Sequence, residues 1–110
     1  NLAIRRYHVN TAQKRNNTYD VTLDELEECI PAGTDVESEF LAKELSQGIS
    51  RFLDTLNYED RFCFVRRYFY VDTVTDIAAA LRWKPHRVTV RLSRIREKLH
   101  NNLKEEGLLE

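Results

Sequence analysis

Apolar residues recur at helical spacing through much of the chain and predict a series of amphipathic helices. The first begins near Asp35. Its apolar positions step by four, four, three and four residues and so share one helix face; they are Leu41, Leu45, Ile49, Phe52 and Leu56. A second helix is predicted over about 57–70, a short third over 74–81 and a last one over 85–106.

Local capping signals support these boundaries. Asn57 is placed to cap the second helix, and Asp60, three residues later, supplies a carboxylate typical of a capping box. Thr73 stands in the same relation to Asp76 at the start of the third helix. Pro85 occupies the first position of the last helix, where its missing N–H costs nothing.

Composition favours an all-α fold. Three Gly and two Pro in 110 residues leave little material for turns, which argues against an all-β sandwich. We expect a small helical bundle containing a helix-turn-helix over 36–107, a flexible acidic linker over 16–35 with a helical turn at 23–29, and over 1–15 the end of a helix that continues upstream. There is no Met and residue 1 is Asn, so we expect a piece of a longer gene product.

Charge is strongly segregated although the net charge is -1. Residues 1–19 carry four bases and no acid, 20–60 carry twelve acids and two bases, and 61–110 carry eleven bases and six acids. The densest basic stretch, 82–98, has seven bases and the single acid Glu97. The overall balance therefore hides a basic last helix, a pattern typical of nucleic-acid binding.

The last helix divides into three faces at about 100° per residue. A core stripe is formed by Val88, Leu92, Ile95, Leu99 and Leu103. The opposite face holds His86, Val90 and Ser93, with Thr89 at its edge. One flank is a continuous basic stripe of Arg87, Arg91, Arg94 and Lys98. A helix lying in a DNA major groove needs small hydrogen-bonding groups toward base edges and long cations toward phosphates, which is this distribution.

Other chemistry has little support. Cys29 and Cys63 lack partners at metal-ligand spacing, and the three His do not cluster with them, so we expect two free thiols and no metal site. The acidic residues lack an accompanying His or a Gly-rich phosphate loop, so we expect neither enzyme activity nor a cofactor or small-molecule substrate. The aromatic residues of 62–70 are expected in helix packing. The longest apolar run is five residues, 77–81, too short for a membrane span.

Several segments resemble region four of bacterial RNA polymerase sigma factors of the sigma-70 family, extracytoplasmic-function type. They are ISRFLDTL (49–56), EDRF (59–62), RRYFY (66–70), DIA (76–78) and the pattern RVxVRLxRIRxKL (87–99). Residues 1–15 resemble the last helix of region two in the same family. The resemblance covers 1–15 and about 36–106, with a divergent linker between them.

The resemblance implies a cytoplasmic sigma factor that recognises the -35 promoter element and starts transcription through core RNA polymerase. Partners implied are the polymerase β flap and β′ clamp, promoter DNA and an anti-sigma factor. By position, bases would be approached by His86, Thr89, Val90, Ser93 and Arg94, and phosphates by Lys84, Arg87 and Arg91. Lys98, on the basic flank, is also assigned to phosphate.

Two departures from the family affect the turn at 82–84. Many members have Gly where Arg82 stands, so Arg82 is expected to adopt a left-handed conformation at some cost. Lys84 replaces the usual small polar cap of the last helix. Two other functions remain open: a stand-alone helix-turn-helix regulator that binds operators as a dimer, and a sigma-like protein-interaction module that does not read DNA.

Overall fold

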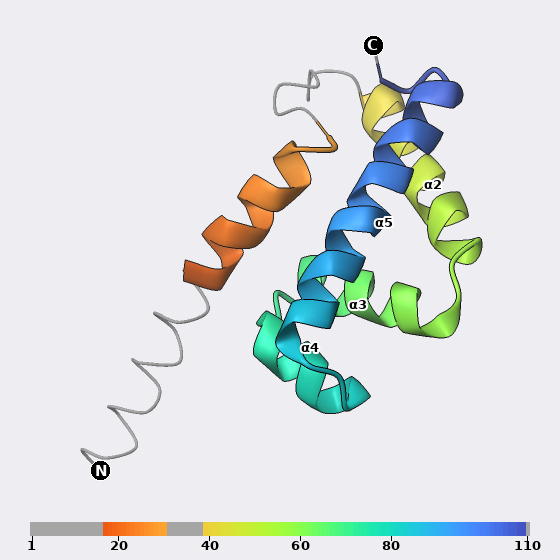
Figure 1. Ribbon diagram of the computed structural model, residues 1–110. Coiled ribbons are helices and arrows are strands. Elements are labelled where there is room, and N and C mark those ends of the chain that lie inside the picture. The colour runs from red at the N-terminus through yellow and green to blue at the C-terminus, as the bar shows by residue number, and fades with distance from the viewer. Residues whose placement is uncertain (1–16, 31–38, 110) are drawn as a thin grey trace.

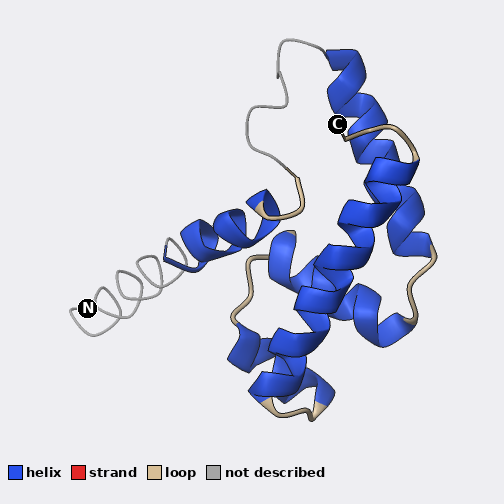
Figure 2. Cartoon of the chain, turned by 45° about the horizontal axis from the view of Figure 1, so that its top comes forward, coloured by secondary structure: helices blue, strands red, loops and turns tan. Residues whose placement is uncertain are grey.

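The computed structural model describes residues 17–30 and 39–109, and every regular element within them is a helix (Figure 2). A helix over 17–27 precedes α2 (Glu39–Asp54), α3 (Tyr58–Tyr68), α4 (Val74–Leu81) and α5 (Pro85–Glu105). The all-α prediction is therefore confirmed. The predicted helix over 1–15 and the predicted helix start near Asp35 lie outside the described residues.

Helix α5 is the centre of the bundle, and α2, α3 and α4 all pack against it (Figure 1). The predicted core stripe of α5 is confirmed, because each of its five side chains is at most 1% exposed. These residues are Val88, Leu92, Ile95, Leu99 and Leu103. From α2, Phe52 is buried and Leu45, Ile49 and the following Leu56 pack against the core, while the side chain of Leu41 lies outside the described part.

The turn over 82–84 joins α4 to α5 and carries the expected strain. Arg82 has φ 59° and ψ 37°, the left-handed region, which costs a residue with a Cβ roughly 1–2 kcal/mol. The Trp83 N–H donates to the Ala78 carbonyl at 2.9 Å and the Arg82 N–H to the Ala79 carbonyl at 3.3 Å, which is a Schellman ending. Lys84 provides no side-chain cap for α5. The two structural expectations for this turn, a left-handed Arg82 and no side-chain cap from Lys84, are confirmed.

The start of α3 agrees with the prediction only in part. The Asn57 side chain caps α3 by accepting from the Asp60 N–H at 2.8 Å. The Asp60 carboxylate, however, does not close a capping box. It is buried beside α5, with its Oδ1 3.4 Å from Nε of Arg91. The capping-box prediction is therefore wrong at Asp60, because a tertiary charge partner competes with the local backbone.

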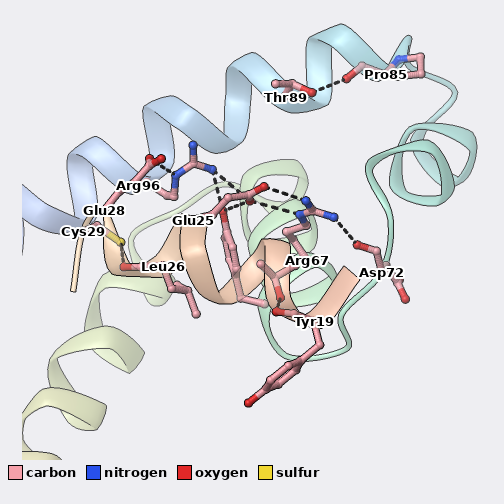
Figure 3. Close-up of polar contacts among 12 residues, drawn as sticks. Tyr19, Glu25, Leu26, Glu28, Cys29, Arg67, Asp72, Pro85, Thr89 and Arg96 are labelled. Atoms are coloured by element: carbon pink, nitrogen blue, oxygen red, sulfur yellow. Dashed lines mark hydrogen bonds and ion pairs between the residues drawn. The ribbon is translucent and has the colours of Figure 1, made fainter. Parts of the chain in front are cut away.

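The predicted flexible linker over 16–35 is corrected by residues 17–30, which form a helix over 17–27 and its end where only a helical turn at 23–29 is predicted. The helix lies against the bundle through one face, where Thr22 and Cys29 are 3% and 2% exposed. Between them Glu25 forms ion pairs with Arg67 of α3 and Arg96 of α5 (Figure 3). The many carboxylates of this segment suggest exposure to solvent, but one of them, that of Glu25, faces inward toward Arg67 and Arg96.

The aromatic residues near the end of α3 divide between core and surface. Phe64 is buried and meets Tyr68 edge-on, with the ring centroids 4.8 Å apart. Phe69 and Tyr70 are 63% and 60% exposed, so neither belongs to the core as predicted, although the Phe69 ring keeps a contact with Phe64 at 6.4 Å between centroids. The chain reverses at Val71, whose positive φ of 59° is unusual for a β-branched residue and turns it away from the line of α3.

Candidate nucleic-acid interface

The first half of α5 and the turn before it present the side chains that the sequence assigns to DNA. Among the predicted base-facing residues, Val90 is half-buried and the other four are exposed: His86, Thr89, Ser93 and Arg94. Among the predicted phosphate contacts, Arg91 is half-buried and three are exposed: Lys84, Arg87 and Lys98. The core stripe of α5 fixes this orientation, because burying it turns the opposite face outward.

Six of these nine residues line one shallow groove of about 410 Å³. They are Lys84, His86, Arg87, Val90, Arg91 and Arg94. The groove therefore brings together four cationic side chains, one imidazole and one apolar contact. Thr89, Ser93 and Lys98 lie on α5 but do not line it. The Thr89 hydroxyl donates to the Pro85 carbonyl at 3.3 Å, so its hydrogen is directed along the helix (Figure 3).

Trp83 also belongs to this surface, although its sequence position alone predicts no role for it. The Arg87 guanidinium carbon lies 3.9 Å from the centroid of the Trp83 ring, and that of Arg91 lies 5.7 Å from it. Both are cation–π distances, and Trp is the ring that binds cations best. The spacing 83, 87, 91 is the signal that could have revealed it, since 87 and 91 are one turn apart on α5 and Trp83 precedes them by the same step in the sequence.

Arg91 differs from the other groove cations in having a buried acidic partner. Its side chain is 32% exposed, whereas that of Asp60 is 8% exposed, and the ion pair between them spans α3 and α5. Arg91 therefore does not extend freely from the flank, as the helical projection alone suggests. A search restricted to α5 cannot find Asp60, which lies 31 positions earlier in the chain.

The remaining arginines of the basic C-terminal part include several with structural roles. Arg96 donates to the Tyr68 hydroxyl at 2.7 Å and lies 3.4 Å from Glu25. Arg67 donates to Glu25 at 2.7 Å and to the Asp72 carbonyl at 2.9 Å. By contrast, Arg87, Arg94 and Lys98 form no ion pair with any other described residue. The unneutralised charge is thus concentrated on the outer flank of α5.

Burial and charge shift the pKa values of groups in the cluster formed by Glu25, Arg67, Tyr68 and Arg96, called the Glu25 cluster. Burial raises the pKa of Glu25, but hydrogen bonds from Arg67 and Tyr68 and the charges of Arg67 and Arg96 outweigh it, so the pKa is lowered overall. Burial and the nearby Glu25 charge raise the pKa of Tyr68. Tyr68 is therefore a neutral hydroxyl that both donates and accepts within the cluster. The cluster fixes helix 17–27 against α3 and α5.

The described residues offer little support for a reactive thiol, a metal site or a membrane span. Cys29 and Cys63 are free and buried, and burial raises the pKa of each thiol to about 11, so both are protonated at neutral pH. Within 17–30 and 39–109, no group of His, Cys, Asp and Glu side chains is arranged to hold a metal ion. None of the helices described is both long and apolar enough to cross a membrane.

Comparisons with protein-family models, with curated proteins and with solved structures found no match to this chain.

Proposed function

We propose that this chain is part of a bacterial sigma factor and that α5 reads the -35 promoter element. The observation that carries the proposal is the groove at the start of α5, where six residues assigned to DNA from the sequence meet. A capped eight-residue helix and a three-residue turn precede α5, which is the order of elements in helix-turn-helix DNA-binding proteins.

In this proposal the outer face of α5 enters the major groove near its N-terminal end. His86, Val90 and Ser93 approach base edges, and Arg94 lies between the base-facing and phosphate-facing sets. A bidentate contact from Arg94 to a guanine supplies about 1–3 kcal/mol of discrimination. Lys84, Arg87 and Lys98 contact phosphates, which adds affinity without sequence preference and fixes the register of the helix.

Promoter recognition by a sigma factor serves transcription initiation, so the proposal includes core RNA polymerase as a partner, through its β flap and β′ clamp, and an anti-sigma factor. It also implies a cytoplasmic, non-enzymatic protein. These parts of the proposal rest on the resemblance of the sequence segments given above. The resemblance joins the basic last helix to the segments 49–56, 59–62 and 66–70 that precede it in the same order.

A protein-interaction module that does not read DNA is the second candidate. The exposed aromatic side chains Phe69 and Tyr70 favour it, because exposed aromatics are enriched at protein interfaces. Arg66 lies over the Tyr70 ring, with its guanidinium carbon 4.3 Å from the centroid, and so holds that ring at the surface. These two residues follow α3, whereas the protein groove that is proposed to bind DNA lies on α5. The two surfaces can therefore be altered separately.

Selection from a pool of randomised duplex DNA tests the proposal. The full 110-residue chain should enrich duplexes that share a short motif, and the selected motif should bind more tightly than scrambled duplex at 150 mM salt. The triple variant Arg87→Ala, Arg94→Ala, Lys98→Ala should lose enrichment, while the matched variant Phe69→Ala, Tyr70→Ala should keep it. Absence of any shared motif, with binding to every duplex alike, would favour the interaction module.

A further inference from the structure

Asp60 is a buried carboxylate next to the candidate interface with an unusual set of contacts. It lies in the first turn of α3, where the Asn57 cap fixes its backbone N–H. Its Oδ1 is fully buried and accepts no hydrogen bond from any described residue. The cation that faces it is Arg91 of α5, whose Nε lies 3.4 Å from Oδ1.

The pair with Asp60 restrains the Arg91 side chain. A buried carboxylate needs a cation nearby, so Asp60 keeps the Arg91 guanidinium at the inner side of the groove. The Trp83 ring, 5.7 Å from the guanidinium carbon, borders the same group. Arg94, which lines the same groove, has no such partner among the described residues. Two arginines of one groove therefore differ in their freedom to reach a phosphate.

We propose that Asp60 is a positioning residue for DNA reading, which acts through Arg91 and sets how selectively the groove binds. This inference rests on the proposed function. Asp60 partly neutralises Arg91 and holds it in one place, so Arg91 meets only DNA whose shape brings a phosphate or base edge to that place. An Arg91 released from Asp60 would contact phosphates in DNA of any sequence. Asp60 thus lowers the affinity for DNA of any sequence and raises the preference for the specific sequence.

Asp60→Asn tests this proposal, because it removes the charge and keeps the shape. Binding of the full chain to the selected duplex and to scrambled duplex is measured over several salt concentrations. The variant should bind scrambled DNA more tightly and should steepen the log-affinity against log-salt slope by about 0.9, the value of one added phosphate contact. The ratio of specific to scrambled affinity should fall by about threefold or more.

The control is Glu59→Gln, which removes the same charge from the exposed neighbouring position of the same helix turn. It should leave the salt slope and the specificity ratio as in the parent. The double variant Asp60→Asn, Arg91→Ala should lose the gain of Asp60→Asn, because no arginine remains to be released. A general effect of net charge predicts that Glu59→Gln and Asp60→Asn behave alike, and that result would overturn the proposal.

Trp83 gives a readout that needs no DNA, since it is the only Trp of the chain. Moving the Arg91 guanidinium relative to the ring should alter Trp83 emission in Asp60→Asn, and this difference should vanish on an Arg91→Ala background. Failure of the parent to bind any duplex would overturn the proposed function and the role in DNA reading together. Unchanged emission in Asp60→Asn, with the salt slope of the parent, would overturn the positioning role alone.

If Asp60→Asn does not fold, the single variants Arg91→Ala and Arg87→Ala decide. Arg87 lines the same groove and has no ion pair among the described residues, so Arg87→Ala should flatten the salt slope by about 0.9, whereas Arg91→Ala should change it by clearly less, because Asp60 already engages that charge. Equal slopes for the two variants would contradict the proposal.

Discussion

Arg82 shows how a single residue can be both correctly predicted and costly. Its φ of 59° places the backbone in the left-handed region, where a Cβ causes strain and Gly is favoured. The Schellman bonds at the end of α4 nevertheless hold it there, and they aim the chain from α4 into α5. The orientation of the groove therefore depends on a strained backbone position.

Arg82→Gly should raise the free energy of unfolding by about 1 kcal/mol, because it relieves this strain. Chemical denaturation measures the change, and Arg82→Ala is the matched control. Alanine keeps the Cβ and removes the charge, so it should stay within about 0.5 kcal/mol of the parent. Destabilisation by Arg82→Gly would show that the guanidinium, and not the backbone angle, decides stability at this position.

The helix over 17–27 is held against the bundle by polar contacts of Glu25 as well as by the apolar side chain of Leu26. Glu25 contacts Arg67, Tyr68 and Arg96, and the Arg67 side chain is only 6% exposed. The Cys29 carbonyl lies 3.2 Å from Nδ1 of His100, which adds a second contact to α5. Removing the Glu25 carboxylate leaves Arg67 without an acidic partner and Arg96 with only the exposed Glu28, 3.5 Å away, and should release the helix.

Glu25→Gln should therefore weaken the protection of amides in 17–27 against hydrogen exchange by about 1.5–3 kcal/mol, the range for hydrogen bonds to charged groups. Glu27→Gln is the control, since Glu27 is exposed on the same helix. Amides of α5 should keep their protection in both variants. Equal protection of 17–27 in Glu25→Gln and the parent would show that apolar contacts suffice to hold the helix.

The same cluster predicts a pH dependence whose sign follows from Glu25. The pKa of Glu25 is lowered in the folded chain, so its contribution is complete above the ordinary value of 4.5 and is lost as pH falls through the lower folded-state value. Protection of 17–27 should decline in acid in the parent. In Glu25→Gln this part of the decline should be absent.

Much of the fold could be predicted because α2 to α5 each bury a regular apolar face. The core stripe of α5 and the caps at Asn57 and Thr73 depend only on spacing and on local chemistry, and both are confirmed. Helix 17–27 could not be predicted in the same way. Its contact face combines Thr22, Glu25 and Cys29, and a lone Glu on such a face reads as solvent-exposed until its arginine partners are known.

The candidate site, too, could be predicted from the sequence only in part. The angular positions on α5 predict which side chains point outward, and the groove gathers six of the nine. The contacts that differentiate Arg91 from Arg94 come from Asp60 and Trp83, on other elements. Those contacts depend on how α3 packs on α5, and no spacing rule within one helix contains that information.

At the level of the whole molecule, the charges are arranged around α5. Helix 17–27 holds four acids and lies along the Arg96 side of α5, where Glu25 and the following Glu28 pair with Arg96. The side of α5 that carries Arg87, Arg94 and Lys98 has no such cover among the described residues. A net charge of -1 is thus compatible with a cationic face that attracts a polyanion.

The central claim is that one face of α5 reads bases while its flank contacts phosphates. The measurement that tests it most directly is binding of Ser93→Ala and Lys98→Ala to a panel of single-base variants of the selected duplex, each at several salt concentrations. Lys98→Ala should weaken all sequences alike and flatten the salt slope by about 0.9. Ser93→Ala should leave the slope unchanged and alter the base preference at one position, by about 1–3 kcal/mol. If both variants kept the specificity profile and the salt slope of the parent, α5 would not be the DNA-reading element.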